Sequence, residues 1–143
     1  MKRKFLLGIA LIACIGYVAC QGPSTGGKST VGVENKIDQP DVMVYYFHGK
    51  QRCKTCVAVG NLAQETIMKN YGANPNVKFL EINTSEKSAD SLVAKYQVAW
   101  NALIIAKGED KIDITQAAFA HAVANPDTVS VIIKKEVDKR LQK

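Results

Sequence analysis

Two cysteines, Cys53 and Cys56, constrain this chain most, because they lie between a predicted strand and a predicted helix. The strand is the run 42–47, which is rich in β-branched and aromatic residues, and the helix-forming run begins at Val57. A helix start exposes unsatisfied backbone N–H groups and the positive end of the helix dipole, which favour a thiolate. The pattern therefore predicts a thiol–disulfide site in an α/β chain.

The spacing gives each cysteine a predicted role. Cys53 is nearer the helix start, so it is the predicted nucleophile that attacks a disulfide. Cys56 lies one turn further along and is the predicted thiol that resolves the mixed disulfide.

The predicted active loop is basic. No Asp or Glu occurs between positions 42 and 64, so the local field favours a thiolate and predicts a lowered pKa for Cys53. The positively charged or titratable residues of the loop are His48, Lys50, Arg52 and Lys54. His48 is either the proton acceptor for Cys56 or a bystander hydrogen-bonded beside the loop.

A structural disulfide and a metal site are the two alternatives for the cysteine pair. A disulfide that closes so short a loop stabilises a protein by only about 2 kcal/mol. A metal site needs more ligands. A single pair of cysteines provides only half of a four-ligand site unless His48 or another molecule adds the rest.

The first 19 residues are predicted to be a signal peptide, with a basic start and an apolar run at 5–19. The run is short for a membrane-spanning helix and ends at Cys20, as in a bacterial lipoprotein signal. Cys20 is therefore the predicted lipidation site, and Cys14 is the alternative. This predicts export to the bacterial cell envelope, with a lipid anchor and a domain outside the cytoplasm, where disulfides persist.

The exported part is predicted to be a flexible tether at 20–40 followed by one domain at 41–143. Lys2, Arg3 and Lys4 supply half of the formal net charge of +6, so the charge does not indicate a nucleic-acid partner.

Within the domain, strands and helices are predicted to alternate and then to give way to a hairpin. The predicted elements after the first helix are a strand at 77–82, a helix at 88–96, a strand at 103–106, a turn at 107–110, a strand at 111–115 and a last helix capped at 125–127. The last helix has an apolar stripe, with its charged residues, Arg140 among them, predicted on the wet side. This order predicts a three-layer α/β sandwich, a central mixed sheet covered by helices.

The order of these segments resembles thioredoxin. The similarity runs from about 42 to 141 and includes the strand with its cysteine pair, then 78–83, 94–98 and 103–109. The segments 45–49 and 52–56 further resemble a small exported group identified as subunits of nitrophenyl-compound nitroreductases. No flavin or nicotinamide site is expected, since no Gly-rich phosphate loop follows any strand, and no cofactor is predicted.

The chain departs from thioredoxin in the loop expected to face the cysteine pair. Thioredoxins have a cis-proline there, where this chain has Asn101 or Ala102, so a trans peptide is expected. Trp100 in the same loop is either a docking surface for a partner or part of the core.

The function predicted from the sequence is that of a membrane-tethered, thioredoxin-like thiol–disulfide oxidoreductase acting on a protein disulfide or dithiol. The alternatives are a module that binds a soft metal or metalloid, and an accessory subunit that passes electrons to one dedicated reductase.

Overall fold

A computed structural model of the chain describes residues 40–143. The predicted signal peptide, Cys14, Cys20 and the tether up to residue 39 lie outside the described residues. The elements in chain order are β1 (Val42–His48), α1 (Lys54–Tyr71), β2 (Val77–Asn83), the short 3-10 helix η1 (Lys87–Ala89), α2 (Asp90–Tyr96), β3 (Ala102–Lys107), β4 (Asp110–Asp113), α3 (Thr115–His121) and α4 (Pro126–Leu141). No helix in this part of the chain is long and apolar enough to cross a membrane.

The four strands form one mixed sheet in the order β2-β1-β3-β4. Strands β1 and β2 pair in parallel, so α1 must cross over between them, while β3 pairs with β1 and β4 in antiparallel fashion. This arrangement confirms the predicted α/β class and the predicted mixed sheet.

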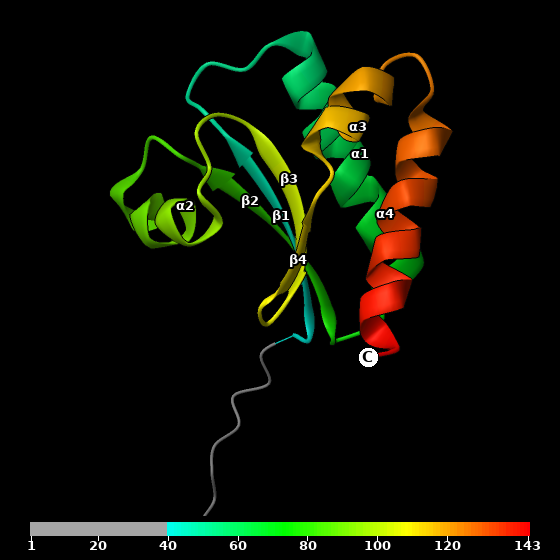
Figure 1. Cartoon of the computed structure of the whole chain (residues 1–143). Helices are drawn as coiled ribbons and strands as arrows, with labels where there is room; N and C mark the ends of the chain where they lie inside the picture. The colour runs from blue at the N-terminus through cyan, green and yellow to red at the C-terminus, as the bar shows by residue number, and fades with distance from the viewer. Residues whose placement is uncertain (1–39) are drawn as a thin grey trace, which may run out of the picture. The chain divides into compact units, whose positions relative to one another are not determined.

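Helices cover both faces of the sheet, with α1, α3 and α4 on one side and α2 on the other (Figure 1). The alternation of side chains along β1 accounts for the two layers of core. Val42, Val44 and Tyr46 are fully buried toward α1 and α4, whereas Phe47 is fully buried in the cluster that includes Tyr96 of α2. Because β1 is central and covered on both faces, its C-terminal end is a rigid support for the loop that follows.

The hairpin that follows β3 is tighter than predicted, and the strand after it is shorter. Gly108 has a φ of 58°, which glycine adopts readily, and Lys107 pairs with Asp110 across the turn. The predicted strand at 111–115 ends at Asp113, and Thr115 instead begins α3, a helix that was not predicted from the sequence. The cause is local, since the Asp113 carboxylate accepts a 2.8 Å hydrogen bond from the Thr115 backbone N–H.

The prediction that Arg140 faces water is wrong. Its side chain is only 4% exposed, and its guanidinium pairs with Glu136 at 2.8 Å and Asp110 at 3.0 Å. The two carboxylates satisfy the buried charge, so α4 can pack this residue against the hairpin.

Candidate active site

The two cysteines lie at the start of α1 with unequal exposure. The helix begins at Lys54, three residues earlier than predicted, and Cys53 is its N-cap. Cys53 is exposed and Cys56 is only 5% exposed. The Sγ of Cys53 accepts a 3.1 Å hydrogen bond from the Cys56 backbone N–H, which is one of the unsatisfied donors of the first turn. A partner can therefore reach Cys53 far more easily than Cys56.

The two sulfurs are joined in a disulfide. The Cα atoms of Cys53 and Cys56 lie 5.0 Å apart, within the usual range for a bridge. The site can therefore exist as a disulfide without movement of the backbone, which a redox pair at this spacing requires.

Tyr46 of β1 contacts the first turn of α1 and stabilises it. Its side chain is fully buried, and its hydroxyl donates a 2.6 Å hydrogen bond to the carbonyl oxygen of Cys56. Burial raises the pKa of Tyr46, and the positive charge of Arg52 partly opposes this. The tyrosine thus remains a neutral hydrogen-bond donor under the backbone of the buried cysteine.

Gly60 makes room for this packing. A Cβ atom at position 60 would lie 2.7 Å from Cε1 of Tyr46 and 2.7 Å from Nη2 of Arg52, both shorter than van der Waals contact. The guanidinium carbon of Arg52 lies 5.5 Å from the centroid of the Tyr46 ring, a cation–π arrangement. Arg52 is therefore held between the ring and the glycine of α1.

An acidic residue outside the predicted site joins the basic loop. The Oε1 atom of Glu81 lies 2.7 Å from Nη1 of Arg52 and 3.4 Å from Nε2 of His48. Glu81 is on β2, and the parallel register places it beside Tyr46, on the face that α1 covers. The positive charge of the loop is therefore partly compensated by a residue far away in the sequence.

His48 is held at the end of β1. Its Nδ1 lies 2.8 Å from the carbonyl oxygen of Gly49, and its Nε2 faces Glu81. The backbone N–H of Thr84 donates a 2.8 Å hydrogen bond to the carbonyl oxygen of His48, which ties the end of β1 to β2. The predicted role of His48 as a proton acceptor for Cys56 stays a prediction. The predicted effect of Arg52 and Lys54, which is to favour the thiolate of Cys53, also stays a prediction.

The loop before β3 faces the disulfide, as predicted from the sequence. The Nδ2 of Asn101 donates a 3.7 Å hydrogen bond to the Sγ of Cys56. Trp100, its neighbour, is 83% exposed, which excludes the core alternative. All peptide bonds within residues 40–143 are trans. The contact from Asn101 was not predicted, because the sequence shows only that position 101 precedes a strand.

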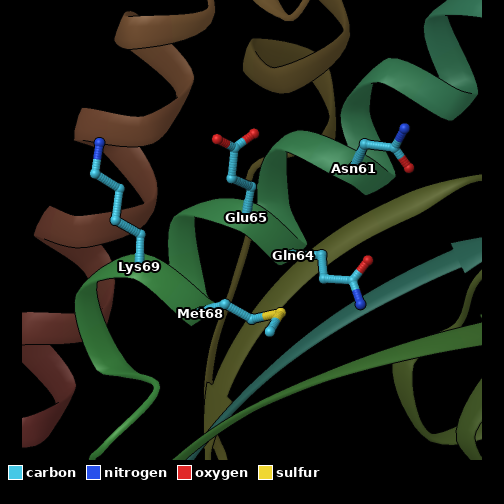
Figure 2. A pocket seen from close by; sticks show the side chains of 5 residues that line it. All are labelled: Asn61, Gln64, Glu65, Met68 and Lys69. Atoms are coloured by element: carbon cyan, nitrogen blue, oxygen red, sulfur yellow. The ribbon is translucent and has the colours of Figure 1, made fainter.

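Two further features of the described residues bear on alternative sites, namely the absence of a metal-binding cluster and a depression on the surface of α1. Among residues 40–143, no three His, Cys, Asp or Glu side chains gather closely enough to hold a metal ion. An open depression lies on the exposed side of α1 and contains neither cysteine (Figure 2). It is lined by Asn61, Gln64, Glu65, Met68 and Lys69.

Two distant similarities to known proteins come from solved structures. No protein-family model matches the chain, and no curated protein matches it either. One similar solved structure, described as that of a malarial protein, is 20% identical, with 66% of this chain and 96% of that chain covered and a TM-score of 0.43. Another is oxidized mitochondrial thioredoxin 3 from Saccharomyces cerevisiae, at 22% identity, 69% and 82% coverage and a TM-score of 0.41. Because both TM-scores are low, the fold assignment rests on the strand order and pairing of the sheet.

Proposed function

We propose that this protein is a thiol–disulfide oxidoreductase that uses Cys53 and Cys56, tethered to a bacterial membrane by a lipid on Cys20. The observation that carries the proposal is the unequal exposure of a disulfide pair at a helix start. Cys53 is the exposed N-cap of α1 and Cys56 is buried one turn further along. An exposed thiol at a helix N-terminus suits nucleophilic attack, and a buried neighbour suits resolution.

In the reducing direction, the thiolate of Cys53 attacks one sulfur of a partner disulfide. A bond forms between that sulfur and Cys53, the partner's S–S bond breaks, and one partner thiolate leaves. Cys56 then loses its proton to water and attacks Cys53, releasing the second partner thiolate. Two electrons pass from the cysteine pair to the partner, and the pair ends as its own disulfide.

The partner is proposed to be a protein disulfide or dithiol outside the cytoplasm. Exposed Trp100 beside the site supports a macromolecular partner, because a large apolar side chain in water gains from being covered. The resemblance to nitroreductase subunits implies an accessory function, which remains a prediction. In that case the natural partner would be one dedicated reductase.

A redox titration of the domain tests the proposal. Thiol labelling across glutathione buffers, after metal removal, should give one two-electron transition for wild type. Cys53→Ser should abolish disulfide exchange, while Cys56→Ser should trap the mixed disulfide on Cys53. Exchange that survives Cys53→Ser would contradict the mechanism, and thiols protected only when a soft metal is restored would favour the metal-binding alternative.

A test with protein substrates separates a general oxidoreductase from a dedicated one. Reduction of insulin by the chain would support general exchange. A clean redox transition without insulin reduction would instead support a dedicated partner.

A further inference from the structure

Building on the proposed function, we infer that Asn101 is a further catalytic residue, whose side-chain amide stabilises the sulfur of Cys56 when that sulfur becomes anionic during disulfide exchange. Neither the spacing of the cysteines nor their charged neighbours points to this residue.

The fold brings Asn101 to the sulfur. Asn101 immediately precedes β3, whose first residue, Ala102, pairs with Phe47 at the end of β1. The cysteine loop leaves the same end of β1, so both segments converge there. The Nδ2 of Asn101 lies 3.7 Å from the Sγ of Cys56, within the distance of a hydrogen bond to sulfur.

The buried sulfur needs such a donor. Cys56 is 5% exposed, so water solvates a thiolate there poorly, and burial disfavours the charged form. A thiolate only accepts hydrogen bonds, which is why the amide nitrogen, rather than the amide oxygen, must face it. Asn101 therefore donates the kind of hydrogen bond that water donates to an exposed thiolate.

Two other donors near Cys56 are directed elsewhere. The hydroxyl of Tyr46 donates to the carbonyl oxygen of Cys56, at 2.6 Å. The backbone N–H of Cys56 donates to the Sγ of Cys53, at 3.1 Å. Within residues 40–143, Asn101 is the side chain that donates a hydrogen bond to the Cys56 sulfur.

The same contact serves both directions of exchange. In resolution, the Cys56 thiolate attacks Cys53, the bond from Cys53 to the partner sulfur breaks, and the electron pair leaves on the partner. In the reverse direction, a partner thiolate attacks Cys53, and Cys56 leaves with the electron pair of the broken disulfide. Asn101 faces the charge on Cys56 in each case.

The reaction of the reduced chain with the aromatic disulfide DTNB separates the two cysteines. Attack by Cys53 releases one thionitrobenzoate, and resolution by Cys56 releases the second, so wild type should show two kinetic phases. Asn101→Leu removes the donor, and Asn101→Asp keeps the shape but presents a negative charge. Both should leave the first phase unchanged and slow the second by about tenfold or more, since hydrogen bonds to charged groups are the strong ones.

Controls separate this role from a structural one. Asn61→Leu, on the exposed side of α1, should match wild type in both phases. Asn101→Gln, which retains an amide donor, should restore part of the second phase. Equal second phases in wild type, Asn101→Leu and Asn101→Asp would overturn the inference while the proposed function stands. A wild type that releases only one thionitrobenzoate per chain would instead overturn the proposed function, and the inference with it.

Discussion

The hydroxyl of Tyr46 donates a 2.6 Å hydrogen bond to the carbonyl oxygen of Cys56, so the strand before the active loop directly supports the buried cysteine. Tyr46 holds the backbone of the first helical turn and does not contact the sulfur through this bond.

Tyr46→Phe should therefore lower stability more than it lowers exchange. Losing a buried neutral hydrogen bond costs about 1 kcal/mol, and more where a polar group is left unsatisfied. Urea unfolding monitored by circular dichroism should show this loss, while the first phase with DTNB should stay within about twofold of wild type. A large loss of that phase with unchanged stability would assign Tyr46 a direct role at the sulfur.

Gly60→Ala should be destabilising although alanine favours helices. The new methyl would clash with Cε1 of Tyr46 and Nη2 of Arg52, and overpacking typically costs about 1–3 kcal/mol. That cost should exceed the gain of about 1 kcal/mol in helix propensity. Gly49→Ala is the matched control, since nothing lies within 4 Å of its added Cβ. Denaturant midpoints measure the change in stability of each variant. A Gly60→Ala variant that is more stable than wild type would contradict the close packing of Tyr46 and Arg52 against position 60.

The Cys53 thiol should titrate below the range of a free cysteine. In a Cys56→Ser variant, the pH midpoint of alkylation should lie below about 8.5, because the N-cap position and nearby cations favour the thiolate. A lowered pKa places more thiolate at neutral pH, so alkylation at that pH should be faster than for a free thiol. Lys54→Gln should raise the midpoint, and Lys69→Gln, in the last turn of α1, should not. A midpoint at or above that of free cysteine would contradict the predicted lowered pKa of Cys53.

Trp100→Ala should impair exchange with a protein disulfide and leave exchange with DTNB unchanged. The side chain is 83% exposed, so its loss should change stability by less than about 0.5 kcal/mol. If it docks the partner, kcat/KM for a protein substrate should fall by about tenfold or more. Met68→Ala, at another exposed apolar residue, is the control. Equal rates for Trp100→Ala and wild type would remove Trp100 from the docking surface.

Asp110→Asn should weaken the fold and reduce its sensitivity to acid. The pKa of Asp110 is lowered, first by the hydrogen bond from Lys143 and then by Arg140, while desolvation opposes both. A carboxyl with a lowered pKa in the folded state stabilises the protein above its unfolded pKa, and this stabilisation is lost as pH falls through the folded value.

Unfolding curves at several pH values would measure this contribution. Asp110→Asn should be less stable than wild type at neutral pH, and the difference should shrink in acid below the ordinary value of 3.8. Glu109→Gln, whose side chain is 96% exposed in the same hairpin, should behave like wild type. A difference that persists unchanged in acid would contradict the ion pair with Arg140.

Much of the fold could be predicted from local patterns. The strand at 42–47, the long helix to Tyr71 and the last helix behind Asn125 and Pro126 were all placed correctly, because burial on one or both faces leaves a clear periodicity. The missed helix α3 follows a side-chain hydrogen bond at Asp113 that competes with the strand. The burial of Arg140 depends on carboxylates from its own helix and from the hairpin, which periodicity does not reveal.

By itself, the sequence determined the strand, the cysteine pair and the helix that follows, and hence the expectation of a redox site on a mixed sheet. The reason is that hydrophobic period, cysteine spacing and helix-start chemistry are all properties of neighbouring residues. Only the tertiary structure decided what surrounds the sulfurs: Glu81 beside Arg52, Tyr46 under Cys56, and Asn101 against the Cys56 sulfur. These contacts join segments distant in the chain, and strand register and helix packing, not local propensity, bring them within a few ångströms of one another.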